Sequence, residues 1–189
     1  TFADWMGMKG IVFTEFLEFV EDQMGPDMVD TIIDDCELST GGAYTAVGTY
    51  PFSELRDLLL ALVKHSGAEP AALLRGFGHK LCATFTNGYA RYFDAAGSLF
   101  DFLGSIDDHI HVEVRKLYPD AELPSMRIAE RNADRLALDY RSERGLEALA
   151  EGLIEATSAY YREPVAVSSA RMSDAQGEFV RFTIERKAA

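Results

Sequence analysis

The stretch Leu136-Ala137-Leu138-Asp139-Tyr140-Arg141-Ser142-Glu143-Arg144 is a β-rich run that ends in a row of polar side chains. In an extended backbone side chains alternate between two faces, so Tyr140, Ser142 and Arg144 are expected on one face. A phenol, a hydroxyl and a guanidinium offer hydrogen-bond donors of different reach, and the flat fork of Arg suits a carboxylate. The row indicates either a site for a guest with paired carboxylates or an ordinary solvated strand end, which is the commoner origin of such a run.

The second half of the chain, after Pro119, is rich in β-forming residues in several short pieces. Alternation and β-branched content predict four strands, and one long amphipathic run between the second and third predicts a helix. The expected strands cover residues 125–128, 136–140, 165–169 and 179–185, and the helix covers residues 145–161.

In the first half of the chain apolar residues recur at helical spacing, which predicts a series of amphipathic helices. Gly25-Pro26 ends the first helix, Ser53 is expected to cap the third, and Tyr118-Pro119 ends the last. The sequence therefore predicts an α+β domain, with an N-terminal helical part followed by a four-stranded antiparallel sheet and its packed helix. The expected helices cover residues 10–23, 29–33, 55–63, 70–85, 89–94 and, as one long helix, 99–117.

Length and composition indicate a single globular domain, since the chain has 189 residues of which 48% are hydrophobic. We expect the domain to span residues 8–189, with residues 1–7 as an upstream extension. A net charge of -13 disfavours partners that are themselves anionic, so neither nucleic acid nor a membrane surface is expected. No apolar run approaches the roughly 20 residues of a bilayer span. The only cysteines, Cys36 and Cys82, are far apart, which favours a reducing compartment and a cytoplasmic protein.

His111 lies within the last expected helix, on its apolar side. A single helix histidine with apolar neighbours is usually a core residue, but its surroundings form a pattern. The segment Ile110-His111-Val112-Glu113-Val114-Arg115-Lys116-Leu117-Tyr118-Pro119, the later Leu123-Pro124-Ser125 and the Tyr140-x-Ser142-x-Arg144 row together resemble the heme nitric oxide/oxygen binding family, H-NOX. This family provides the sensor domain of soluble guanylate cyclases and of bacterial regulators. The resemblance covers residues 8 to about 187, including the opening Met8-Lys9-Gly10-Ile11-Val12-Phe13 and Gly76-Phe77-Gly78.

The resemblance implies a heme b cofactor (protoporphyrin IX iron) with one histidine as its only protein ligand. Two histidines compete, but residues two apart on a helix differ by about 200°, so His109 and His111 cannot both face one heme. His111 has the family's spacing, seven residues before Tyr118 and thirteen before Pro124. His111 is therefore the expected axial ligand of the iron.

The other cofactor-binding residues also follow from the resemblance. Tyr140, Ser142 and Arg144 would bind the two propionates, while Val12 and Pro124 would press on the porphyrin. A single imidazole leaves the opposite face of the iron open for a diatomic gas.

The resemblance further implies which gas is bound. Oxygen-binding relatives place a Tyr five residues after the last Arg of the row, where this chain has Leu149, and their other two polar pocket positions correspond to Phe16 and Leu81. All three are apolar, so we expect nitric oxide and carbon monoxide to bind and dioxygen to be excluded. The position of the loop tyrosines Tyr44 and Tyr50 relative to the pocket stays open.

The signalling output is expected to pass to a separate protein, such as a histidine kinase or a cyclic-di-GMP enzyme, as in relatives of this length. The chain itself is not expected to be an enzyme, because it has no nucleophile elbow, HExxH motif or phosphate-binding glycine loop. Some bacterial members of the family that the chain resembles carry a cysteine-rich zinc site near the C-terminus, but no cysteine follows Cys82 here, so no such site is expected. The alternative is a heme-free redox-sensing interaction module of the same fold, with Cys36 or Cys82 as the sensor.

Overall fold

The computed structural model describes residues 7–187. Residues 1–6 of the expected extension lie outside this part, whereas Gly7 begins strand β1 (Gly7–Lys9). This strand pairs antiparallel with β2 (Thr49–Pro51), with Gly7 opposite Pro51. The sequence analysis did not anticipate this two-stranded ribbon, because each strand is only three residues long and its partner is about 40 residues away.

The N-terminal lobe consists of three helices, α1 (Gly10–Met24), α2 (Pro26–Asp34) and α3 (Phe52–Ser66). The aromatic residues of α1 recur at helical spacing, and Phe13, Phe16 and Phe19 are all buried in one hydrophobic cluster. The prediction of Ser53 as the cap of α3 was wrong. The N-cap is two residues earlier, at Pro51, whose side chain has no hydrogen-bonding group, and the helix starts at Phe52 directly after the ribbon.

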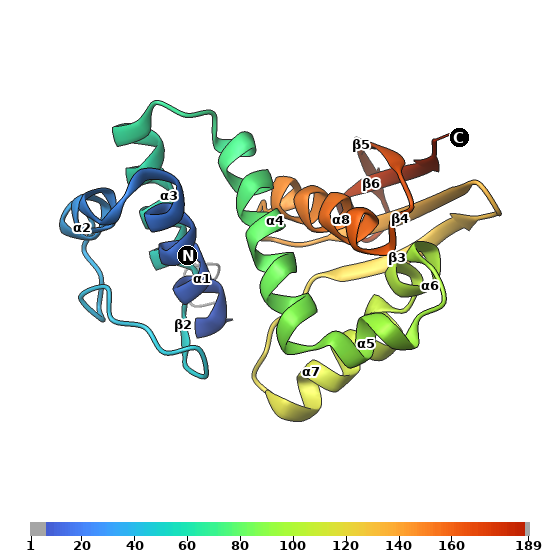
Figure 1. Cartoon of the computed structure of the whole chain (residues 1–189), viewed down its shortest axis with the longest axis horizontal. Helices are drawn as coiled ribbons and strands as arrows, with labels where there is room; N and C mark the ends of the chain where they lie inside the picture. The colour runs from blue at the N-terminus through green and yellow to red at the C-terminus, as the bar shows by residue number, and fades with distance from the viewer. Residues whose placement is uncertain (1–6, 188–189) are drawn as a thin grey trace.

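Helix α4 (Pro70–Gly88) stands between this lobe and the rest of the molecule (Figure 1). It is followed by α5 (Ala90–Ala95) and α6 (Leu99–Gly104). In the described residues no helix is long and apolar enough to cross a membrane.

The expected single helix over residues 99–117 is divided into three parts. After α6 the chain makes a π-helical turn, η2 (Ile106–Ile110), and then continues as α7 (His111–Leu117). The amide of Ile110 donates to the carbonyl of Ser105, five residues back, at 3.3 Å. One residue more than in an α turn is therefore accommodated immediately before His111, a feature often found at functional sites.

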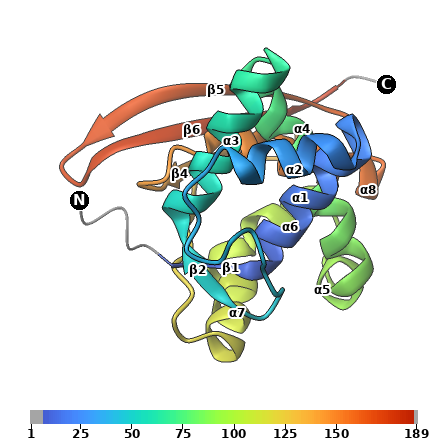
Figure 2. The ribbon, with the colours of Figure 1, turned by 90° about the vertical axis from the view of Figure 1, so that its left-hand side faces the viewer.

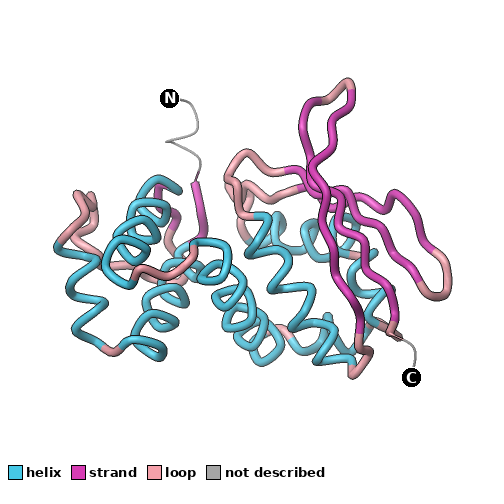
Figure 3. Tube along the Cα trace, turned by 90° about the horizontal axis from the view of Figure 1, so that it is seen from above, coloured by secondary structure: helices cyan, strands magenta, loops and turns pink. Residues whose placement is uncertain are grey.

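The C-terminal lobe is a four-stranded antiparallel sheet in the order β3-β4-β6-β5, which confirms the α+β prediction. Helix α8 (Glu147–Tyr161) lies against one face of the sheet (Figure 1), and the hairpin of β5 and β6 extends past the helices (Figures 2 and 3). The buried face carries cross-strand pairs such as Leu138 with Phe182 and Leu136 with Ile184. The strands are β3 (Ser125–Arg131), β4 (Arg135–Arg141), β5 (Val165–Asp174) and β6 (Gly177–Arg186).

Two glycines allow α4 and α8 to come into backbone contact. A Cβ atom at Gly152 would lie 2.2 Å from the carbonyl oxygen of Arg75, and one at Gly78 would lie 2.5 Å from that of Leu149. Real side chains cannot be accommodated at these distances, so the close approach depends on glycine at both positions. This contact fixes the distance between the two helices that form one wall of the central cavity.

Candidate functional site

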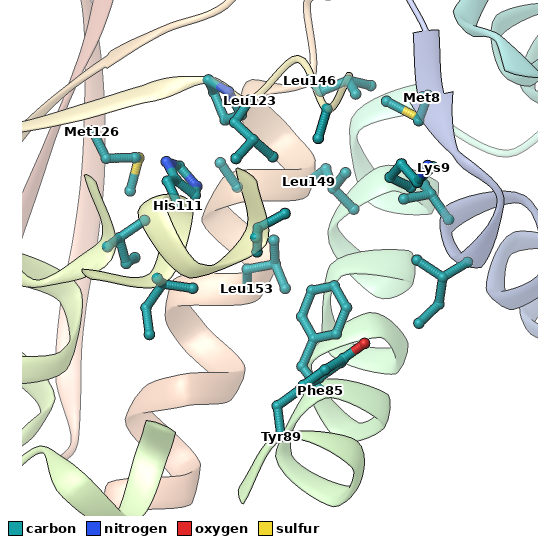
Figure 4. A pocket seen from close by; sticks show the side chains of 18 of the residues that line it. Met8, Lys9, Phe85, Tyr89, His111, Leu123, Met126, Leu146, Leu149 and Leu153 are labelled. Carbon is teal, nitrogen blue, oxygen red and sulfur yellow. The ribbon is translucent and has the colours of Figure 1, made fainter. Parts of the chain in front are cut away.

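A cavity of about 500 Å³ lies between α4, α8, α7 and the β1–β2 ribbon. Its walls are mostly apolar and come from both hydrophobic clusters of the molecule, with Met8, Leu149 and Leu153 from one and Met126 and Ile154 from the other. Its volume falls in the usual range of about 300–1,000 Å³ for cofactor and ligand sites. Figure 4 shows His111 on one side of this space and Lys9 on the other.

His111 contributes a nearly buried imidazole to the cavity wall, with 9% of the residue exposed. Its Nδ1 lies 2.9 Å from Oδ1 of Asp107, one helical turn earlier. Burial lowers the pKa of His111, and this effect outweighs the opposite effect of the Asp107 carboxylate. The ring is therefore held neutral, with Nδ1 donating to Asp107 and Nε2 left to act as a ligand.

Asp107 is itself fixed to the sheet. Its other oxygen, Oδ2, accepts from the amide of Met126 at 2.8 Å and from Oγ of Ser125 at 3.1 Å. The sequence analysis did not assign this role to Asp107. The four-residue interval to His111 was the available signal, because such residues are neighbours on a helix.

The polar row of Tyr140, Ser142 and Arg144 faces the cavity, but its three members do not share one strand face as predicted. The strand ends at Arg141, and Ser142 and Arg144 lie in the following turn, where the amide of Arg144 donates to Oγ of Ser142 at 3.2 Å. All the same, Tyr140, Ser142 and Arg144 line the cavity together. Burial raises the pKa of Tyr140, so its phenol stays a neutral donor.

Arg144 is the least satisfied polar group of the site. Its side chain is only 5% exposed, and its terminal nitrogens donate to the carbonyls of Glu122 (2.7 Å) and Gly7 (2.9 Å). Within the described residues, however, its buried Nε has no hydrogen-bond partner. A buried donor without a partner is costly, so this nitrogen favours an acceptor supplied by a guest.

The remaining predicted site residues divide into two groups. Val12, Pro124 and Leu149 line the cavity. Phe16 and Leu81 do not; they lie in the adjoining hydrophobic core, where Phe16 contacts Phe77 edge-to-face.

His109, the rejected ligand, and Tyr44 and Tyr50, whose position the sequence left open, do not line the cavity. His109 is exposed, on the outer side of η2. Tyr44 is stacked on Phe13 and donates to Glu54 at 2.7 Å, and Tyr50 contacts both rings from the side.

The sequence analysis missed two aromatic residues of the cavity wall, Phe85 on α4 and Tyr89 directly after its last residue. They follow Leu81 at successive four-residue intervals, which could have placed them on the same helix face. The Tyr89 hydroxyl makes no hydrogen bond with the part of the chain that the structure describes, and Figure 4 shows it beside Phe85. Tyr89 directly follows α4 and adds a phenol hydroxyl to the cavity wall next to Phe85.

Comparison with known proteins agrees with this geometry. The model of the Haem-NO-binding family matches residues 9–169, most of the chain. The chain belongs to this family. H-NOX domains are heme-binding gas-sensor domains rather than catalytic ones.

Several solved H-NOX structures are similar to this chain. An unliganded Fe(II) H-NOX protein from K. algicida is 36% identical, with a TM-score of 0.91 over 96% of this chain and 98% of that one. An H-NOX protein from S. oneidensis in the Fe(II)NO state shares the fold, at 22% identity, with a TM-score of 0.85 over 96% of this chain and 100% of that one.

Two curated relatives are the soluble guanylate cyclases 89Db and 89Da of Drosophila melanogaster, each 28% identical over 141 residues. The match covers 72% of this chain but only 20% of each cyclase, so the H-NOX chain spans about a fifth of the length of these relatives.

The residues present fit a heme. The neutral His111 offers Nε2, the walls are mostly apolar, and the buried Nε of Arg144 needs an acceptor such as a carboxylate.

Proposed function

We propose that the chain is a heme b sensor that binds nitric oxide and carbon monoxide, excludes dioxygen, and regulates a separate signalling protein. The observation that carries the proposal is the buried His111–Asp107 pair, which faces a cavity whose opposite wall is apolar at Leu149. When bound, the heme iron would supply one open coordination position for a diatomic gas.

His111 would be the only protein ligand, with Asp107 fixing the tautomer and the orientation of its ring. A histidine that ligates metal through one nitrogen commonly donates its other N–H to a carboxylate, and this partner raises its basicity. Here the carboxylate is tied to β3, so the sheet holds the imidazole in place.

The propionates would bind Tyr140, Ser142 and Arg144. Burial lowers the pKa of Arg144 while the carboxylate of Glu122 opposes this shift, and the side chain remains a cation with an unused donor. A carboxylate there would complete its hydrogen bonds and compensate its charge.

Dioxygen exclusion follows from the residue types on the α8 wall. Bound dioxygen carries partial negative charge and needs a nearby donor, whereas nitric oxide does not. Leu149 offers no donor. Tyr89 is a phenol of the cavity wall whose hydroxyl has no partner in the described residues, so it could overturn this part of the proposal and enters the test.

Signalling would begin at His111. His111 would hold the iron, and Val12 and Pro124 would press on the porphyrin; a gas that loosened the hold of His111 would free α7 and relieve this pressure. The likeness to the heme-domain portion of cyclases supports an output through another protein or domain. A histidine kinase or a cyclic-di-GMP enzyme is the partner we propose.

One absorption experiment tests the proposal. The purified, reduced protein should show a Soret band that shifts on addition of nitric oxide and of carbon monoxide but not on exposure to air. A colourless folded protein would refute the heme assignment. A stable oxy spectrum that disappears in Tyr89→Phe would refute dioxygen exclusion and identify the donor.

The structure gives no comparable support to a redox-sensing role for the cysteines. Cys82 is buried beside Thr157, and Cys36 is partly buried. Burial is the main cause that raises the pKa of both thiols, which disfavours the reactive thiolate.

A further inference from the structure

Lys9 is a second cation in the wall of the cavity. Its residue lines the space, and its side chain is only 14% exposed although it carries an ammonium group. Figure 4 places it beside Met8, across the cavity from His111. An ammonium at such a position is costly unless an anion or several acceptors surround it.

The contacts of Lys9 leave it incompletely satisfied. Its Nζ donates to Oγ1 of Thr49 at 2.6 Å and lies 4.5 Å from the centroid of the Tyr118 ring. Oδ2 of the 58% exposed Asp120 lies 3.7 Å away, so it forms an ion pair with the ammonium but is too far for a hydrogen bond. Of the three N–H donors of the ammonium, one is used within the described residues.

Strand β1 links Lys9 to Arg144. The guanidinium of Arg144 donates to the carbonyl of Gly7 at 2.9 Å, and Lys9 is two residues further along the same three-residue strand. The two cations therefore lie near opposite ends of β1, and each retains an unused donor. This spacing suits a guest with two separate carboxylates.

We propose that Lys9 is a second cationic residue of the carboxylate clamp, holding one of the two propionates of heme while Arg144 holds the other. This inference rests on the proposed heme-sensor function. Two propionates bring two negative charges to an edge where Glu122 and Asp120 already lie, in a chain of net charge -13. A single guanidinium that is already paired with Glu122 cannot compensate both.

The experiment measures heme loss to an excess of an apomyoglobin scavenger. It uses proteins loaded with heme b or with heme b dimethyl ester, which lacks the two carboxylates. Lys9→Gln removes the charge but keeps a donor for Thr49, and Lys9→Arg keeps the charge. Lys64→Met is the control, because Lys64 pairs with Asp35 and does not line the cavity.

Lys9→Gln should lose heme b about tenfold faster than the wild type, and Lys9→Arg should lose it at nearly the wild-type rate. With the dimethyl ester, Lys9→Gln and wild type should be equal, because no carboxylate remains for the ammonium to hold. Equal acceleration with both porphyrins would show that Lys9 only holds the ribbon, and no acceleration with either would equally refute the proposal. A wild type that binds no heme would overturn the sensor function as well.

Discussion

A shift of two positions along one helical segment changes the surroundings of a histidine completely, as His109 and His111 show. The two are separated by a single residue, yet one is exposed on the outer side of η2 and the other is buried against the cavity with its Nδ1 bonded to Asp107. The prediction of His111 as the ligand rests on its residue intervals to Tyr118 and Pro124. The carboxylate that orients the ring was not predictable in the same way, because its second contact is made with β3, about 19 residues later.

Replacing the two histidines separately tests the assignment. His111→Ala should abolish the five-coordinate ferrous spectrum, because no other imidazole in the described structure lines the cavity. His109→Ala is the matched control and should leave the spectrum unchanged. The reverse result, with the spectrum lost only in His109→Ala, would contradict the assignment.

Asp107→Asn should weaken the bond between His111 and the heme iron without breaking it. The amide can still accept from Nδ1 but lacks the charge that makes the imidazole a stronger donor to iron, so the iron–histidine stretching frequency should fall and heme affinity should drop by about tenfold. Asp108→Asn, at the exposed neighbouring position, is the control. Identical Raman frequencies in Asp107→Asn and the wild type would show that the charge of Asp107 has no part in ligation.

Leu149→Tyr tests the basis of dioxygen exclusion. A phenol on this wall would donate to bound dioxygen and should slow its dissociation by about tenfold or more. Leu149→Phe, which has the ring without the hydroxyl, should not. If flash photolysis gives the same dioxygen kinetics for both variants, the donor argument is wrong.

At the level of elements, the α4–α8 contact sets the width of the cavity. Gly152→Ala puts a methyl group 2.2 Å from the Arg75 carbonyl oxygen and should destabilise the domain by about 1–3 kcal/mol. Gly88→Ala, at the last residue of α4 with nothing within 4 Å, should be neutral or slightly stabilising. Urea unfolding measures both, and equal stability of the two variants would contradict the close-contact argument.

Elements with local hydrophobic patterns were predictable, and those made by distant contacts were not. The four long strands and the main helices follow from periodicity. The β1–β2 ribbon depends on hydrogen bonds between residues about 40 apart, and the π turn before His111 depends on Ser105 and on the tie from Asp107 to β3. The polar row was wrongly predicted to share one strand face. The strand ends at Arg141, and a turn after it brings Ser142 and Arg144 to the cavity beside Tyr140.

For the whole molecule, heme binding should appear as thermal stability. A ligand that binds only the folded chain stabilises it by about 2.7 kcal/mol at a hundredfold excess over Kd. For a domain of this size the melting temperature should rise by roughly 5–10 °C. Calorimetry at increasing heme concentration checks this, with the His111→Ala variant as a control that should gain less. A melting temperature independent of heme would contradict the cavity assignment.

The cavity lies between the two hydrophobic clusters of the molecule. Whatever fills it supplies the apolar contacts that join the N-terminal lobe to the sheet. Cellular proteases act on the unfolded fraction of a protein, and that fraction grows as such a ligand becomes scarce. The supply of iron and porphyrin in the cell would therefore set how many copies of the chain survive, as well as how many can respond to a gas.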